Sequence, residues 1–264
     1  MSDIIPREER IKVADTEFRC QIWPGDEARR PLLVCNGIGA NLELLSPLAE
    51  HLAGRTLIFF DAPGIGGSSP PRYPYRPFML ARRVMRMLDK LGYGKIDVMG
   101  ISWGGMLAQQ LALQYPVRVK KVVLAATAPG VTMVPGKFGA LSKMLSPKRY
   151  ADRYFMVKNF ETLYGDPYHI AADYARKLKR PTVRGYMAQM MALWGWTALP
   201  YLPLMRQPTL VLTGDNDNIV RVINGKLLAA FIRRSRLEII EGGHLFILSN
   251  PEQTFPLIDE FLSA

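Results

Sequence analysis

The chain has 264 residues, of which 48% are hydrophobic and 22% are charged, so it can bury the core of one large globular domain and is not a disordered chain. No motif recurs at a fixed period, which excludes solenoid and fibrous architectures. The formal net charge is +11, but no recognition motif accompanies the basic residues, and we therefore expect no nucleic-acid partner.

The first residues, MSDIIPREERIKV, alternate charged residues with short apolar pairs, unlike a secretory signal. Apolar runs are broken by Thr, Pro or Gly before they reach the ~18 residues that a membrane-spanning helix needs. The sequence therefore predicts a cytoplasmic protein without a transmembrane segment. Cys20 and Cys35 form neither a metal-ligand cluster nor a disulfide framework, and we expect both to be buried free thiols.

Short apolar runs bounded by turn residues alternate with helical patterns along the chain, which is typical of an α/β fold with a mostly parallel sheet and helices on both faces. An antiparallel pair of strands is expected first, near residues 11–14 and 18–23. The parallel strands are expected at 31–35, 56–60, 95–100, 120–127, 209–214 and 237–240. The helices are expected at 42–52, 78–91, 104–115, 222–231 and 251–262.

The interval between the sixth and seventh strands is far longer than the dozen or so residues that a crossover between parallel strands needs. Its helical periodicity predicts a lid at 131–206, inserted between two parts of the α/β core at 1–130 and 207–264. The lid holds seven of the 13 methionines, Trp194 and Trp196, and 12 basic against four acidic residues. This composition fits either packing against the core or a loose substrate groove.

The strongest chemical motif is Gly100-Ile101-Ser102-Trp103-Gly104-Gly105, which directly follows an expected strand and opens an expected helix. In this context G-x-S-x-G indicates a nucleophile elbow, a tight turn that holds a serine in a strained conformation. A side chain at Gly100 or Gly104 would crowd the neighbouring strand and helix, so both glycines have a steric role. We therefore expect Ser102 to be a nucleophile.

A serine nucleophile needs a histidine base and a carboxylate that orients it. Of the three histidines, His51 falls inside a helical pattern and His169 falls in the lid, whereas His244 follows the strand 237–240 on a loop at the carboxyl end of the sheet. We assign His244 as the base. The acid is expected on the loop after strand 209–214, where Asp217 is favoured over Asp215, which is placed to bind backbone amides as a turn former.

The oxyanion of a tetrahedral intermediate needs amide donors. The expected donors are the backbone N–H groups of Trp103, after the nucleophile, and Ile38, in the loop after strand 31–35. A second glycine-rich stretch, 61–68, lacks the full dinucleotide-binding pattern and is interpreted as a tight loop that shapes the pocket. No nucleotide or metal motif is present, so no cofactor and no metal are predicted.

The segments FFDAPGIGGSS, MGISWGG, LTGDNDNIV and EGGHLF occur in the order expected of the α/β-hydrolase superfamily, which the chain resembles along nearly its whole length. CNGIGANLELLSPL, KKVVLAATAPGVTMVPGK, SPKRY and GWTALPYL are also similar to intracellular depolymerases of medium-chain-length poly(3-hydroxyalkanoates). The resemblance implies Ser102 as nucleophile, Asp217 as acid and His244 as base, with no cofactor.

The resemblance also implies the reaction, which is hydrolysis of a polyester of 3-hydroxy fatty acids through an acyl-enzyme. The alternative is a small-molecule carboxylesterase or lactonase for medium-chain acyl esters, because the same triad serves both. Such polyesters are stored as granules, and the basic lid is expected to help dock on the granule surface through Lys137, Lys143, Lys148 and Arg149. The sequence carries no indication of oligomeric state.

Overall fold

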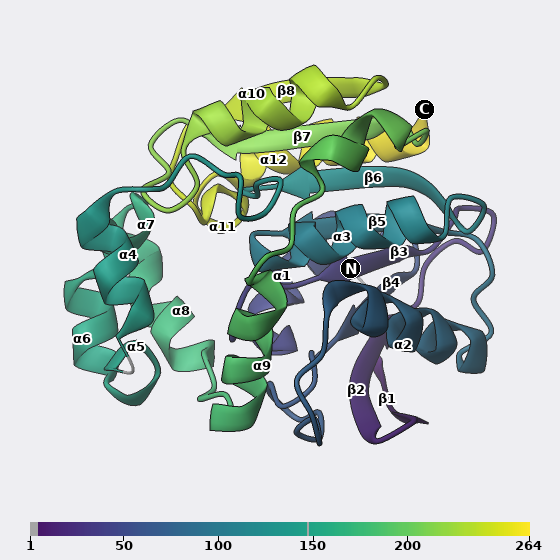
Figure 1. Cartoon of the computed structure of the whole chain (residues 1–264), viewed down its shortest axis with the longest axis horizontal. Helices are drawn as coiled ribbons and strands as arrows, with labels where there is room; N and C mark the ends of the chain where they lie inside the picture. The colour runs from purple at the N-terminus through teal and green to yellow at the C-terminus, as the bar shows by residue number, and fades with distance from the viewer. Residues whose placement is uncertain (1–4, 147) are drawn as a thin grey trace.

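The computed structural model describes residues 5–146 and 148–264. The first four residues of the predicted core and Pro147 of the predicted lid lie outside the described residues. The described chain forms one eight-stranded sheet with the strand order β1-β2-β4-β3-β5-β6-β7-β8 (Figure 1). The strands are β1 (Arg7–Val13), β2 (Thr16–Trp23), β3 (Leu32–Cys35), β4 (Leu57–Phe60), β5 (Ile96–Ile101), β6 (Val119–Ala125), β7 (Thr209–Gly214) and β8 (Ser235–Ile240).

The sheet is antiparallel only at its N-terminal edge, where β1 pairs with β2 and β2 pairs with β4. From β4 to β8 all neighbouring strands are parallel. Because parallel strands end at the same edge of a sheet, the loops that follow β3, β5, β6, β7 and β8 all emerge on one side. The predicted mostly parallel sheet is therefore confirmed, and it brings the loops with the expected site residues together.

Helices cover both faces of the sheet, as expected for strands that are buried on both faces. One core packs α2, α3 and α10 against the sheet, and a second core packs α1, α11 and α12 against the opposite face. The helices that precede the long insertion are η1 (Leu42–Leu45), α1 (Ser46–His51), α2 (Pro77–Lys90) and α3 (Trp103–Gln114), and those that follow it are α10 (Val222–Phe231), α11 (Phe246–Ser249) and α12 (Pro251–Ser263).

Four predicted elements show the larger differences from the structure in their bounds. The first strand, expected near residues 11–14, is β1 and begins four residues earlier, at Arg7. The helix expected at 42–52 is a 3-10 turn, η1, followed by the short α1, which has a proline in its first turn. The strand expected at 120–127 ends at Ala125, because Ala126 adopts a positive φ of 48° that turns the chain out of the sheet. The last strand begins two residues earlier than expected, at Ser235.

Cys20 and Cys35 are free and buried, as predicted, and burial raises the pKa of both thiols. Among the described residues, no helix is both long and apolar enough to cross a membrane.

The chain between β6 and β7 forms a series of short helices, and a third core of buried side chains holds most of them together. Figure 1 shows α4 to α8 grouped beyond one end of the sheet, with α9 between this group and α2 in the same view. These elements are α4 (Phe138–Leu145), α5 (Lys148–Ala151), α6 (Arg153–Lys158), α7 (Phe160–Tyr164), η2 (Tyr168–Ile170), α8 (Ala171–Lys177), α9 (Val183–Leu193) and η3 (Leu199–Leu204).

Two polar residues at the start of η1 connect this insertion to the sheet. Asn41 is fully buried, and its amide donates to the carbonyl of Lys177 and accepts from the backbone N–H of Lys179. The Glu43 carboxylate accepts from Asn41, from Arg19 of β2 and from the Lys179 ammonium. Burial opposes ionisation of Glu43, but these donors outweigh it and lower its pKa to about 2.

We expect Glu43→Gln to lower the free energy of unfolding at pH 7 by about 1–3 kcal/mol, because the depressed pKa makes the ionised carboxylate stabilising. Such a carboxylate contributes its full stabilisation at pH values above its pKa in the unfolded chain, near 4.5. The contribution is lost as the pH falls from there toward the folded-state pKa of about 2. Urea denaturation at pH 7, 4 and 3 should show the two proteins differing at pH 7 and converging as the pH falls from 4 to 3. Glu50→Gln, at an exposed position on α1, is the matched control, and equal stability of Glu43→Gln and wild type at pH 7 would contradict the expectation.

Candidate active site

Ser102 lies at the turn between β5 and α3 with φ 54° and ψ −119°, a strained conformation for a residue with a Cβ. Hydrogen bonds hold the turn on both sides, since Ser102 donates its N–H to Ala125 and its carbonyl accepts from the Thr127 hydroxyl. A Cβ at Gly104 would lie 2.0 Å from the carbonyl oxygen of Cys35, and one at Gly100 would lie 2.5 Å from the carbonyl oxygen of Gly104. The steric role expected of the two glycines is thus present in the fold.

The structure brings Ser102, His244 and Asp217 together. Nδ1 of His244 lies 2.8 Å from Oδ2 of Asp217, and Nε2 lies 2.9 Å from Oγ of Ser102. The carboxylate can only accept, so the Nδ1 proton faces Asp217 and the Nε2 lone pair faces the serine hydroxyl. His244 and Asp217 are 4% and 5% exposed, which shields the pair from water. This arrangement can remove the proton of Ser102 when it attacks a carbonyl.

Each residue of the loop Asp215–Asn218 has a separate hydrogen-bonding role. Asp217 turns Oδ2 toward His244, while its Oδ1 accepts from the backbone N–H groups of Ile219 and Val220, both at 2.8 Å. The Asp215 carboxylate accepts from the N–H of Gly242, in the turn before His244. The two asparagine side chains donate to carbonyls of α7 and the residue after it. Asp215 therefore supports the loops, as expected for a turn former, and does not face the imidazole.

The loop after β3 lies directly beside the serine. A Cβ at Gly37 would be 3.6 Å from Cβ of Ser102. Within the described ranges 5–146 and 148–264, neither the Ile38 N–H nor the Trp103 N–H donates to a protein acceptor. Two such amides beside the nucleophile can bind an oxyanion, which is the role that the sequence predicted for them.

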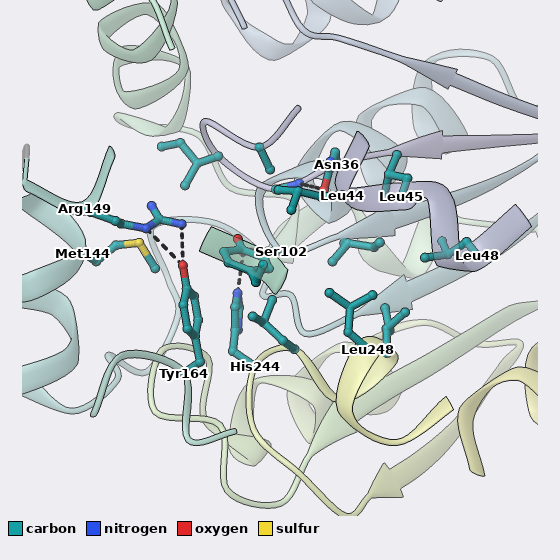
Figure 2. A pocket seen from close by; sticks show the side chains of 17 residues that line it. Asn36, Leu44, Leu45, Leu48, Ser102, Met144, Arg149, Tyr164, His244 and Leu248 are labelled. Carbon is teal, nitrogen blue, oxygen red and sulfur yellow. Dashed lines mark hydrogen bonds between the residues drawn. The ribbon is translucent and has the colours of Figure 1, made fainter. Parts of the chain in front are cut away.

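A narrow cavity of about 50 Å³ opens at Ser102 and His244. Figure 2 shows its two ends, with the labelled leucines Leu45, Leu48 and Leu248 on one side of His244 and with Arg149 and Met144 on the other. Since about 10–15 Å³ is needed for each water molecule, a cavity of this volume has room for only a few of them.

A family model for the alpha/beta hydrolase fold matches residues 30–251. The chain belongs to the α/β-hydrolase family. The expected fold class is thereby confirmed together with the hydrolase assignment.

Two curated relatives and two solved structures show how far this likeness extends. The hydrolase is 46% identical over 258 residues to a poly(3-hydroxyalkanoate) depolymerase of Ectopseudomonas oleovorans, covering 96% of this chain and 91% of the relative. It is 28% identical to 3-oxoadipate enol-lactonase 2 of Acinetobacter baylyi, with 86% of each chain covered. The enol-lactonase structure from Burkholderia xenovorans LB400 matches 97% of this chain and all of its own with a TM-score of 0.84 at 20% identity. A hydrolase structure from Pseudomonas aeruginosa PA01 matches 97% of this chain and 98% of its own with a TM-score of 0.83 at 23% identity. The resemblance to poly(3-hydroxyalkanoate) depolymerases that the sequence indicated is confirmed by the first relative, and together with family membership it supports carboxylic-ester hydrolysis.

Asp166 of the hydrolase holds the loop that carries His244, and the sequence did not predict this contact. Its buried carboxylate accepts from the N–H groups of Gly243 and Leu245, on either side of His244, and from the Ser249 hydroxyl. Burial raises its pKa in spite of these donors. No local sequence signal marks Asp166, because its partners lie about 80 residues further along the chain.

Tyr164 and Arg149 were not predicted either. The Tyr164 carbonyl accepts the backbone N–H of His244 at 2.6 Å, and its ring stacks on the imidazole with centroids 6.2 Å apart. Arg149 donates to the Tyr164 hydroxyl from the cavity side and is only 4% exposed. Arg149 was predicted to be one of the exposed cations that dock on a granule. That prediction is wrong, because α5 turns the Arg149 side chain into the cavity.

The remaining candidates lie elsewhere. His51 stacks on Phe255 at 4.3 Å between centroids, and His169 is exposed on η2. The loop 61–68 was expected to shape the pocket, but it does not line the cavity at Ser102. It packs instead against the start of α9, where the Gly64 carbonyl accepts from the N–H and hydroxyl of Thr182.

Proposed function

We propose that this hydrolase cleaves the ester bonds of a medium-chain-length poly(3-hydroxyalkanoate) and releases 3-hydroxy acids or short oligomers. The observation that carries the substrate assignment is the 46% identity to a poly(3-hydroxyalkanoate) depolymerase over nearly the whole of both chains. The alignment of Ser102, His244 and Asp217 supports an acyl-enzyme mechanism.

In this mechanism Ser102 attacks the ester carbonyl while His244 takes the hydroxyl proton, and Asp217 stabilises the imidazolium that forms. The N–H groups of Ile38 and Trp103 bind the negatively charged oxygen of the tetrahedral intermediate. His244 then gives its proton to the departing alkoxide, which leaves as the hydroxyl end of one chain. Water, activated by the same imidazole, hydrolyses the acyl-enzyme and regenerates Ser102.

The apolar end of the cavity suits the alkyl side chain of a medium-chain 3-hydroxy acid. It is lined by leucines of η1 and α1 and by residues of α11 and the loop before it, among them Leu44, Leu45, Leu48, Leu245 and Leu248. An alkyl side chain of several carbons exceeds the present volume of about 50 Å³, so we infer that residues 131–206 act as a lid that moves to admit the polymer.

Acid release from an amorphous suspension of poly(3-hydroxyoctanoate) tests this function, with wild type and Ser102→Ala compared and 4-nitrophenyl octanoate run in parallel. The proposal predicts release from the polymer that depends on Ser102. Turnover of the 4-nitrophenyl ester without any release from the polymer would contradict it.

That second outcome would favour a carboxylesterase or lactonase for small medium-chain esters. The small cavity and the similarity to 3-oxoadipate enol-lactonase 2 of Acinetobacter baylyi favour this candidate. The two functions share the chemistry at the carbonyl and differ only in what the lid admits.

We also propose that the enzyme acts in the cytoplasm on the surface of storage granules and docks through α4. Eleven of the nineteen large apolar side chains exposed in the described residues belong to 131–206. Phe138 and Leu145, at the two ends of α4, are 87% and 61% exposed, beside Lys137 and Lys148. Apolar side chains flanked by cations suit an apolar surface coated with anionic lipid.

Co-sedimentation with polymer granules tests the docking surface. Phe138→Ser with Leu145→Ser should lower the bound fraction several-fold, and Lys137→Gln with Lys148→Gln should weaken the salt dependence of binding. Val117→Ser, at an exposed apolar position outside the lid, is the control. Unchanged binding of both double variants over a range of salt would contradict docking through α4.

A further inference from the structure

Arg149 is a buried cation that lines the catalytic cavity. Its guanidinium donates to the hydroxyls of Tyr164, at 3.0 and 3.1 Å, and Tyr150, at 2.7 Å. Within residues 5–146 and 148–264, no carboxylate lies within 4.0 Å of it, and two of its five N–H groups have no acceptor. Burial raises the pKa of Tyr150, so its phenol stays neutral at pH 7 and leaves the charge of Arg149 uncompensated.

A buried charge is costly unless it is paired, so the cavity is complementary to an anion. The internal ester groups of the proposed polymer are neutral. A carboxylate occurs only at the free acid end of a chain and on the released product. A planar guanidinium is well suited to a carboxylate because it can donate two parallel hydrogen bonds.

Two contacts place Arg149 next to the reacting groups. Through Tyr164 it adjoins His244, since the two rings stack 6.2 Å apart, and Figure 2 shows Tyr164 between His244 and the guanidinium. Through Tyr150, whose hydroxyl donates to the carbonyl of Ile38 at 3.0 Å, it adjoins the loop that offers the oxyanion donor. The leucines that suit the acyl chain are labelled on the opposite side of His244 in the same view.

We propose that Arg149 forms a subsite for the terminal carboxylate of an oligo(3-hydroxyalkanoate), so that the enzyme removes 3-hydroxy acids one at a time from the carboxyl end. This inference rests on the proposed function and specifies its substrate. Three bonds separate the ester oxygen from the carboxylate carbon of the last unit, a reach of about 4 Å at roughly 1.5 Å per bond. Because Arg149 and Ser102 line the same cavity, a carboxylate on Arg149 would direct the last ester of the chain toward Ser102.

The steps balance as an ordinary hydrolysis. Ser102 forms an ester with the acyl part of the oligomer, and the C–O bond to the last unit breaks. That unit takes the proton from His244 and leaves as a 3-hydroxy acid with its carboxylate on Arg149. Water then cleaves the acyl-enzyme, and the shortened oligomer gains a new terminal carboxylate that can bind the same subsite.

A second cavity with a mostly basic lining also borders Arg149. This cavity, of about 520 Å³, is also lined by Arg153, Arg176, Lys177, Lys179 and Arg180, and its one acidic residue is Glu43. A hollow with this charge raises the local concentration of anions, which suits entry and exit of carboxylates.

The test compares the trimer of 3-hydroxyoctanoate with its terminal primary amide, which has the same ester bonds to cleave and no charge. For wild type we expect kcat/KM to be at least about tenfold higher for the free acid, since tenfold corresponds to one weak charge-assisted contact. Arg149→Gln should bring the ratio close to one, and Arg149→Lys should retain part of the preference. A purely structural role of Arg149 would lower both rates and keep their ratio, which would overturn the inference.

A second measurement needs no change in Arg149. Inhibition of 4-nitrophenyl octanoate hydrolysis by 3-hydroxyoctanoate should be at least about tenfold stronger than by the neutral 3-hydroxyoctanamide. Equal inhibition by the two compounds would overturn the carboxylate subsite. Wild type that cleaves both trimers equally, or that cleaves neither, would refute the subsite, whereas the proposed function is decided separately by the release of acid from the polymer.

Discussion

Replacing Ser102 by Ala is expected to lower the turnover of 4-nitrophenyl octanoate by at least about 10⁴-fold, as in other serine triads. In the part of the chain that the structure describes, the Ser102 hydroxyl is the one nucleophile hydrogen-bonded to His244. Ala therefore leaves the imidazole with nothing to deprotonate at that position. Residual turnover would come from the oxyanion donors and from substrate binding. Initial rates and labelling with a fluorophosphonate measure the effect.

The same substitution should leave the fold intact. Ser102 already carries a Cβ at φ 54°, so Ala introduces no backbone strain that the wild type lacks. We therefore expect thermal unfolding of Ser102→Ala and wild type at the same temperature. Ser142→Ala, at an exposed position on α4, is the control and should keep full turnover. A Ser102→Ala protein that stays folded and retains most of its activity would remove Ser102 from the mechanism.

The elbow was predictable because its evidence is local. A strand, a tight turn and a helix follow one another within a few residues, and both glycines are explained by neighbours that a Cβ would strike. His244 and Asp217 were predictable for a related reason, since parallel strands deliver their following loops to one edge of the sheet. The choice of Asp217 over Asp215 agrees with the hydrogen bonds of that loop.

Arg149 and Asp166 were not predictable, because their roles depend on how the inserted helices pack. A basic residue in a basic segment is normally solvated, and only the turn of α5 directs Arg149 inward. Asp166 follows the last turn of α7, and its contacts with the His244 loop form only when α7 lies against the sheet edge. Periodicity locates such helices in the sequence but does not give their orientation in space.

Asp217→Asn is expected to lower turnover by about 10⁴-fold, the loss known for the equivalent change in a serine protease triad. Oδ1 of Asp217 is fixed by two backbone N–H groups at 2.8 Å, so the asparagine oxygen should occupy that position. Its NH₂ group then faces Nδ1 of His244, where it can only donate. The imidazole proton is thereby shifted to Nε2, and the base can no longer accept the proton of Ser102.

The matched control is Asp215→Asn, two residues away in the same loop. Asp215 accepts one hydrogen bond from Gly242, and the asparagine oxygen can accept it equally well, so turnover should fall by less than about threefold. Initial rates with 4-nitrophenyl octanoate for both variants measure the difference. If Asp215→Asn lost as much activity as Asp217→Asn, the effect would lie in the loop as a whole, because Asp217 contacts the imidazole and Asp215 does not. If Asp217→Asn kept more than a tenth of the wild-type turnover, other contacts would have to orient His244. The structure offers two, the Tyr164 ring stacked on the imidazole and the hydrogen bonds of Asp166 to the loop that carries His244.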